Sequence, residues 1–153
     1  PDKVLLSMSV GSQSMSWTRA IKRKRELIMV AEDTDAGVIG LSSGGNNRDR
    51  VSHYKGEVYT LYISADHQNR GVGRKLLHGL FDALNNNDCG GAVIWVLASN
   101  PARFFYEAVG GIRAGERNEK LWGVELHEIA YAWPDLSVTL ADGGLRRQRR
   151  DAG

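Results

Sequence analysis

A turn with two glycines, placed between a strand-like run and a helix-like run, constrains the fold of this chain most. Residues 57–64 (EVYTLYIS) are rich in β-branched and aromatic residues, which is typical of a strand. Leucines at helical spacing then predict an amphipathic helix over 71–85. Between these runs lies the segment 68–73 (QNRGVG). The chain must therefore pass from a strand directly into a helix at the glycines.

This junction has the chemistry of an anion site. The first N–H groups of a helix have no partner within the helix, and they favour negative charge. Gly71 and Gly73 lack a β-carbon, so a phosphate can approach the main chain, while Arg74 and Lys75 add positive charge. The segment is neither a P-loop nor the dinucleotide-binding pattern GxGxxG. Taken alone, it leaves a phosphate site and an ordinary glycine turn open.

The N-terminal part of the chain is predicted to hold a helix and a hairpin. The spacing of Trp17 and Ile21 predicts a helix over 10–25, and the basic residues at its end suit the helix dipole. Residues 26–33 and 38–43 have the composition of two strands, joined by the turn TDAG as a hairpin.

The C-terminal part alternates strand and helix signals. Residues 92–98 (AVIWVLA) are apolar on both alternations, which indicates a strand covered on both faces. Asn100 and the proline after it start a helix that ends at Gly110. Two strands follow, and the alternation of the second slips between Leu126 and Ile129, which predicts a bulge. The order of the elements is that of an α/β fold around one mixed sheet.

Composition limits the chain to one domain. Its 153 residues, 42% of them hydrophobic, suffice for one ordinary core. The longest apolar run is too short for a bilayer span, and no segment resembles a signal peptide, so we expect a cytoplasmic protein that makes no membrane contact. The single cysteine, Cys89, can form no internal disulfide and has no metal-ligand companion. We therefore expect no metal site.

Positive charge is concentrated at the C-terminus. The last eleven residues carry a net charge of +3, which leaves −1 for the rest of a chain whose total is +2. The chain before these eleven residues therefore lacks the excess of positive charge that is typical of a nucleic-acid-binding protein. We assign 1–136 to the domain and predict a disordered basic tail at 137–153. The tail is either a solvated terminus, which we favour, or an adhesive arm for RNA, membrane or a protein partner.

The glycine turn and a downstream segment together resemble the signatures of the GCN5-related N-acetyltransferases, the GNAT family. Residues 68–73 fit the family pattern Q/R-x-x-G-x-G/A, which opens a helix after a strand. Residues 98–111 (ASNPARFFYEAVGG) resemble the second family motif. The resemblance covers 26–133. It implies a single GNAT-like α/β domain with a mixed, mostly antiparallel central sheet flanked by helices, and an acyltransferase that uses acetyl-coenzyme A (acetyl-CoA).

The resemblance also implies where acetyl-CoA binds. The diphosphate would lie on backbone amides from Asn69 to Arg74, in agreement with the anion chemistry of the turn. The pantetheine arm would pair like an added strand with the main chain of 57–64, which is expected to splay from the strand at 92–98. The cofactor-binding residues implied in this way are Leu61, Ile63, Gln68, Asn69, Arg70, Gly71, Val72, Gly73, Arg74 and Asn100.

Two catalytic residues follow from the same resemblance. Tyr106 matches the family tyrosine that gives a proton to the departing thiolate; the alternative is an aromatic residue packed in the core. Glu57 has the spacing of the catalytic glutamate of the histone-acetylating branch and would act as the base through water, if its surroundings are otherwise apolar. The alternative is a solvated strand edge. A backbone amide near Leu61 or Tyr62 would stabilise the oxyanion.

The remaining site residues are weaker candidates. Tyr59 shares a face with Glu57 by strand alternation and is expected to line the acceptor site. His53 is a second candidate base, and we predict surface positions for the other histidines, which are His67, His78 and His127.

This sequence departs from the family pattern at three places, one of which is VGGI at 109–112 where LGF is common. One residue separates Asn100 from Ala102 where the family has two, so Asn100 is either a cofactor contact or only a helix cap. The family opens with a strand and a helix, yet about 25 residues precede the strand at 26–33, so we expect the first family strand to be missing or replaced.

The resemblance implies that the acceptor is a primary amine of a small molecule or a protein, which attacks acetyl-CoA in a ternary complex. The loop 44–56 has no acidic cluster, which disfavours polyamines and aminoglycosides. Two other functions stay open: a non-catalytic acetyl-CoA-binding module, and a nucleic-acid adapter that works through the arginine-rich tail, which the near-neutral body disfavours. A homodimer is also left open.

Overall fold

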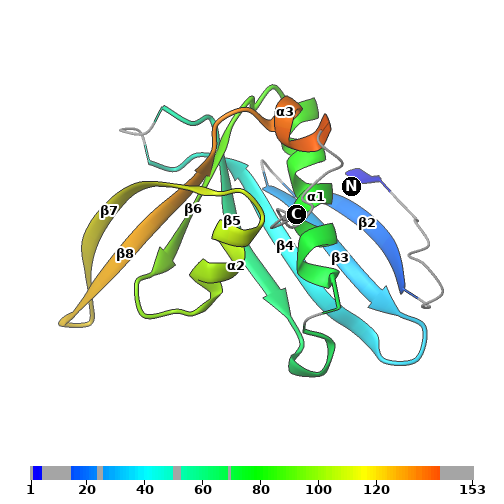
Figure 1. The fold of residues 1–153 in the computed structure, drawn as a ribbon. Coiled ribbons are helices and arrows are strands. Elements are labelled where there is room, and N and C mark those ends of the chain that lie inside the picture. The colour runs from blue at the N-terminus through cyan, green and yellow to red at the C-terminus, as the bar shows by residue number, and fades with distance from the viewer. Residues whose placement is uncertain (1, 5–14, 24–25, 50–52, 69, 142–153) are drawn as a thin grey trace, which may run out of the picture.

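One mixed sheet carries the fold. The computed structural model describes residues 2–4, 15–23, 26–49, 53–68 and 70–141. Its strands lie in the order β1-β2-β3-β4-β5-β6-β8-β7, and every neighbouring pair is antiparallel except β5 and β6 (Figure 1). The strands are β1 Asp2–Val4, β2 Met15–Arg23, β3 Glu26–Asp33, β4 Gly37–Asn46, β5 Gly56–Ile63, β6 Ala92–Leu97, β7 Ile112–Leu121 and β8 Val124–Trp133. The predicted α/β fold with a mostly antiparallel sheet is confirmed.

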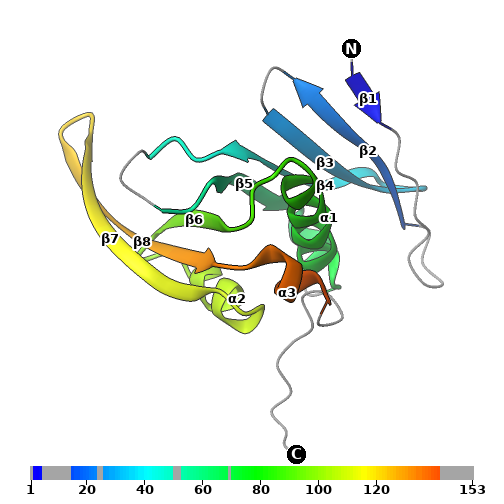
Figure 2. The same ribbon diagram turned by 90° about the horizontal axis from the view of Figure 1, so that it is seen from above.

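The helices gather on one face of this sheet. They are α1 Val72–Asn86, α2 Ala102–Ala108 and α3 Leu136–Ala141, with a short 3-10 turn, η1, at Ala65–His67. Figures 1 and 2 show α1 lying over β3 and β4, and α2 near β6. The apolar stripe of α1 is buried, as its spacing predicts, and Phe81 packs against Trp133 of β8 with ring centroids 4.9 Å apart. One core therefore joins both halves of the sheet through α1.

Strands β5 and β6 diverge after a short parallel stretch. They pair only at Gly56–Val58 and Ala92–Ile94. Beyond that point β5 pairs with β4 as far as Ile63, while β6 pairs with β8 to Leu97. The splay that the family resemblance implied is confirmed, and among the described residues it leaves one edge of each strand without a strand partner.

The helix predicted at 10–25 is wrong where the structure describes it. Residues 15–23 form β2, which pairs with β3, and the register shifts between Trp17 and Arg19. A bulge of this kind inserts one residue and interrupts the period of two, so apolar residues in a bulged strand can be spaced like those of a helix. The rest of the predicted helix lies outside the described residues. β2, with β1, stands where the sequence analysis expected a missing or replaced first strand.

The bulge predicted in the last strand is also wrong. β8 pairs with β6 without a register shift, and the shift between β7 and β8 lies in β7, between Arg113 and Gly115. The end of β8 is apolar on both alternations because residues 129–133 are all buried. β7 runs to Leu121, beyond the segment 111–115 (GIRAG) from which the first of these two strands was predicted.

The predicted tail begins with ordered structure. Residues 137–141 belong to α3, whose Leu136 is fully buried and whose Leu140 packs against the core. For these five residues, the prediction of disorder is wrong. The rest of the tail lies outside the described residues, and the division between domain and tail stays a prediction.

Candidate active site

A pocket of about 850 Å³ lies at the diverging ends of β5 and β6. The end of β5, the turn before α1 and the starts of α1 and α2 form its walls. It brings together eight of the residues that the sequence assigned to the site: Leu61, Ile63, Gln68, Gly71, Gly73, Arg74, Asn100 and Tyr106. Tyr62, His67, Pro101, Ala102 and Phe105 complete the lining.

The two glycines of the turn serve different purposes. Gly71 precedes α1 with a φ of +81°, which favours glycine, and a β-carbon there would have no neighbour within 4 Å. Its backbone is therefore open to a ligand. At Gly73 a β-carbon would lie 3.0 Å from Ile63 Cδ1 and 3.3 Å from the ring of Phe105. Glycine at 73 thus lets α1 approach β5 and α2 closely.

The N-terminus of α1 suits an anion. The helix runs for 15 residues, and its first turn contains no acidic side chain. Its first N–H groups have no helical partners, and the helix dipole adds partial positive charge. Arg74, which lines the pocket, adds a full positive charge.

The end of β5 presents backbone groups to the pocket. The Ser64 N–H donates to Ile39 O at 2.8 Å, so Ser64 points toward β4. Because backbone groups alternate along a strand, those of Leu61 and Ile63 point away from β4. The Gln68 side chain accordingly reaches Ile63 O, at 3.4 Å. An extended ligand could pair with this edge as an added strand does.

Tyr106 reaches the pocket from α2. Its side chain is buried, with only 5% of its surface exposed, and burial raises its pKa to about 12. The hydroxyl therefore keeps its proton at neutral pH. The ring packs edge-on against Trp133, with centroids 6.4 Å apart. The tyrosine is thus both a packed aromatic residue and a proton-bearing group of the pocket wall.

Asn100 lies where it could serve either as a helix cap or as a cofactor contact. Its Oδ1 accepts a hydrogen bond from the Ala102 N–H at 2.9 Å, which caps the start of α2, and the residue also lines the pocket. Two other predicted cofactor residues do not line it: Arg70 is exposed, and the Val72 side chain is in the core. Asn69 lies outside the described residues.

Glu57 lies outside this pocket, on the face of the sheet away from the helices. Only 4% of its surface is exposed, and Arg48 holds its carboxylate. The Arg48 N–H and Nε donate to Oε1 at 2.9 and 3.1 Å, and Nη2 donates to Oε2 at 3.0 Å. The hydrogen bond with Glu57 also raises the pKa of Arg48. The expected apolar surroundings of Glu57 are therefore wrong, while its role as a base stays a prediction.

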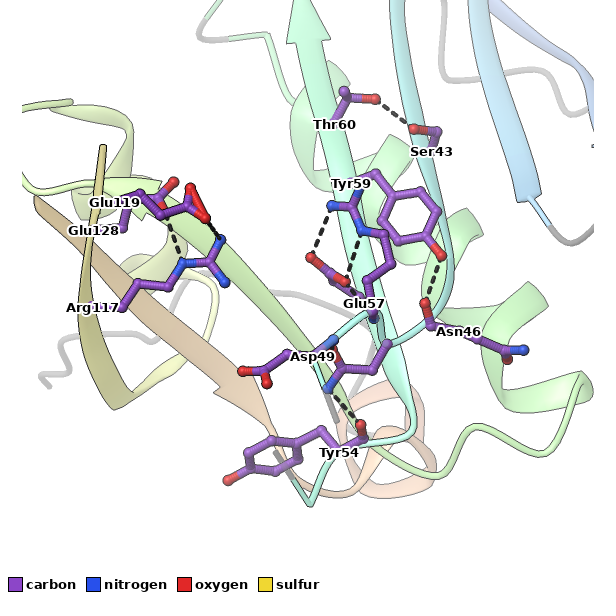
Figure 3. A network of polar contacts seen from close by, with 12 residues as sticks. Ser43, Asn46, Asp49, Tyr54, Glu57, Tyr59, Thr60, Arg117, Glu119 and Glu128 are labelled. Carbon is purple, nitrogen blue, oxygen red and sulfur yellow. Dashed lines mark hydrogen bonds and ion pairs between the residues drawn. The ribbon is translucent and has the colours of Figure 1, made fainter. Parts of the chain in front are cut away.

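Tyr59 joins Glu57 in one cluster, on the face where alternation placed it. The pairing of Ser43 with Thr60 and of Gly44 with Val58 makes Tyr59 the extra residue of a bulge in β5. The Arg48 guanidinium stacks over its ring at 4.1 Å, and the Tyr59 hydroxyl donates to Asn46 O (Figure 3). Burial raises the pKa of Tyr59.

A second cluster of the same composition lies across β6. Arg117 stacks over the ring of Trp95 at 4.0 Å. Its Nε donates to Glu128 at 2.8 Å (Figure 3). Glu119 lies 3.9 Å from its Nη2. The sequence analysis missed both arginines. The register of the β7–β8 hairpin, set by its turn at Trp122 and Gly123, is the signal that could have paired Arg117 with Glu128.

The histidines are divided between surface and pocket. The exposed His127 side chain lies 3.0 Å from Glu116, which confirms its surface position, and His53 is exposed in its loop. His78 is half-buried on α1. His67 lines the pocket with 14% of its side chain exposed, so its surface prediction is wrong.

Two searches of the described ranges limit other chemistry. Within them, no group of three or more histidine, cysteine, aspartate or glutamate side chains is placed to hold a metal ion. No helix in the part of the chain that the structure describes is both long and apolar enough to cross a membrane.

Comparison with known proteins gives one family. The model of the acetyltransferase (GNAT) family matches residues 7–111. The chain is 36% identical over 111 residues to the uncharacterized N-acetyltransferase YuaI of Bacillus subtilis, covering 72% of this chain and 64% of that protein. The chain thus spans about two thirds of the length of this curated relative.

Solved structures share the fold at lower identity. A GNAT-family protein from Desulfovibrio desulfuricans superposes with a TM-score of 0.61 at 16% identity, covering 73% of this chain and 69% of that chain. The structure of yncA from Salmonella typhimurium with its cofactor acetyl-CoA superposes with a TM-score of 0.58 at 23% identity, covering 72% and 65%.

Proposed function

Since the chain belongs to the acetyltransferase (GNAT) family, we propose that it is an N-acetyltransferase that moves an acetyl group from acetyl-CoA to a primary amine of a small molecule or a protein. The observation that carries this proposal is the pocket between β5 and α2. It combines an open glycine turn at a helix N-terminus, a strand edge that no other strand covers in the described ranges, and a buried, protonated tyrosine. These are the three kinds of group that acetyl-CoA and its transfer chemistry require.

The pocket residues fit the parts of acetyl-CoA. The open backbone at Gly71 and the amides that follow suit its diphosphate, and Arg74 and Gln68 flank them. The main chain of Leu61 and Ile63 suits the amides of the pantetheine arm. When bound, acetyl-CoA would supply the acetyl thioester that the amine attacks in a ternary complex.

Tyr106 is our proposed acid. With a pKa of about 12, its hydroxyl holds a proton at the wall of the pocket and can give it to a departing thiolate. The same hydroxyl would be useless as a base at neutral pH, because it does not ionise there. Of the two expected oxyanion donors, the Leu61 amide is the one we propose, because it points away from β4, whereas by the same alternation the Tyr62 amide points toward β4.

Glu57 is our proposed base, on the side of the sheet away from the cofactor pocket. Its carboxylate and Tyr59 share Arg48, so the three residues present one polar surface to an acceptor. Since Arg48 occupies both carboxylate oxygens, proton transfer to Glu57 would pass through water. Location in the cytoplasm and a homodimer remain predictions.

Calorimetric titration with acetyl-CoA tests the proposal, with ATP and NAD as controls. We expect binding of acetyl-CoA in the micromolar range and none of the controls. Thiol release with a panel of amines would then measure transfer and identify the acceptor. Binding without turnover on any amine would favour a non-catalytic acetyl-CoA-binding module, and absence of binding would exclude the proposed function.

A further inference from the structure

His67 lies at the entrance of the glycine turn and connects three parts of the fold. Its Nδ1 is 2.8 Å from the Ser64 hydroxyl at the end of β5. Its Nε2 is 3.7 Å from Asp33 Oδ2 at the end of β3. The imidazole is 14% exposed, and the Asp33 side chain is 21% exposed. The ring therefore bridges the segment that carries the pocket wall to a strand that takes no part in the pocket.

The Asp33 end of this bridge is itself fixed. The Asp35 N–H donates to Asp33 Oδ1 at 2.8 Å in the turn between β3 and β4. This backbone hydrogen bond, chiefly, lowers the pKa of Asp33, so the carboxylate is ionised at neutral pH. Its Oδ2 is left to face His67.

The Ser64 end fixes the start of the turn. The Ser64 N–H donates to Ile39 O, and the His67 N–H donates back to Ser64 O at 2.9 Å. A side-chain hydrogen bond also joins Ser64 and His67, so two hydrogen bonds connect the ends of η1. The Ser64 N–H attaches this turn to β4. The next residue, Gln68, reaches back to Ile63 O.

We infer that His67 is a positioning residue for the proposed reaction, which with Ser64 and Asp33 holds the glycine turn in the conformation that receives the cofactor diphosphate. The inference rests on the proposed function. Both imidazole nitrogens face protein partners, so His67 acts through the turn and does not need to touch the ligand. A prearranged turn loses less conformational freedom when a ligand binds, which increases affinity.

The same three residue types form hydrolytic triads, but the geometry argues against that activity. Ser64 is absent from the pocket lining, so its hydroxyl is not presented to a bound thioester. Tyr106, which carries a proton and lines the pocket, belongs to α2 and is not part of the bridge formed by Ser64, His67 and Asp33. The bridge therefore orders the turn and supplies no nucleophile.

Titration of the full chain with acetyl-CoA, together with steady-state kinetics, tests the inference. His67→Ala removes the hydrogen bond to Ser64 and the 3.7 Å approach to Asp33, and it should raise Kd and KM for acetyl-CoA by roughly tenfold while kcat changes less than about twofold. Asp33→Asn and Ser64→Ala each weaken one contact and should raise Kd by a smaller factor. His127→Ala, which removes an exposed side-chain contact with Glu116 outside the pocket lining, is the matched control and should leave Kd unchanged.

The outcomes separate the two proposals. If the wild-type chain binds no acetyl-CoA, the proposed function and this inference both fail. If the wild type binds and His67→Ala binds equally well, only the inference fails. If kcat and the melting temperature of His67→Ala fall together with affinity, or if Asp33→Asn and Ser64→Ala both leave Kd unchanged, the bridge is a structural element of the fold and the inference is overturned.

Discussion

The two faces of the sheet at the divergence of β5 and β6 differ in what their polar groups do. On the helix face the pocket presents backbone that no neighbouring strand covers in the described part of the chain: the open turn at Gly71, and the β5 edge at Leu61 and at Ile63, whose carbonyl the Gln68 side chain reaches. On the other face the arginines are already paired, Arg48 with Glu57 and Arg117 with Glu128 (Figure 3). Unpaired groups mark the side prepared for a ligand. Paired charges indicate that the other side mainly stabilises the sheet.

The largest effect is expected at the glycine turn. Gly71→Asp places a negative side chain where the diphosphate would approach, and it should weaken acetyl-CoA binding by roughly 100-fold or more in calorimetry. Aspartate tolerates a positive φ better than most residues, so the fold should survive. The melting temperature should stay within a few degrees of wild type.

Gly123→Asp is the matched control for this variant. Gly123 has a φ of +78°, and a β-carbon there would also meet nothing within 4 Å, but it lies at the tip of the β7–β8 hairpin. The same change of charge and backbone strain at this tip should leave affinity unaltered. Equal affinity of the two variants would contradict the assignment of the glycine turn.

The next largest effect is expected at the pocket wall. Tyr106→Phe removes the proton donor and keeps the ring, so kcat should fall by about 100-fold while Kd for acetyl-CoA changes little. Stopped-flow or steady-state thiol release measures this. Tyr131→Phe is the control: this buried hydroxyl donates to Glu107 at 2.6 Å, outside the pocket lining, and its loss should lower stability rather than kcat. A parallel fall of kcat and affinity in Tyr106→Phe would indicate a packing role.

The sequence predicts the helix face of the site far better than the other face. Gly71, Gly73 and Gln68 act through the local backbone of one turn, so a short motif is enough to place them. Arg48 and Arg117 pair with glutamates on other segments: Arg48 reaches Glu57 from the loop between β4 and β5, and Arg117 reaches Glu128 across the β7–β8 hairpin. Such partners depend on loop conformation and on strand register, which a short motif does not contain. Strand β2 was predicted as a helix for a related reason, because its bulge between Trp17 and Arg19 interrupts the alternation of a strand.

His67 shows a further limit of the sequence. Its partner Ser64 is three residues away, a spacing that a capping interaction allows, but Asp33 lies on a strand reached only through the fold. Isolated histidines in a polar turn are usually at the surface. Only the packing of η1 against the end of β3 reveals the bridge.

A smaller catalytic effect is expected at Glu57. Glu57→Gln keeps the shape and removes the charge, and it should lower kcat/KM by about tenfold at unchanged Kd for acetyl-CoA, if the base acts through water as proposed. Glu128→Gln is the matched control, because Glu128 is also held by an arginine stacked on an aromatic ring. Similar kinetics for the two variants would assign Glu57 to the fold alone.

The smallest effects are expected on stability at the paired face. Arg48→Gln leaves the Glu57 carboxylate, 5% exposed at its side chain, without its main partner and should lower the free energy of unfolding by about 1 to 2 kcal/mol. The value stays below that of a fully buried pair because Arg48 itself is 64% exposed and water screens it. Arg117→Gln should cost less, below about 1 kcal/mol, since Glu128 is 17% exposed and can be hydrated. Urea denaturation of both variants measures the difference, and a larger loss for Arg117→Gln would mean that burial of the carboxylate does not control the strength of these pairs.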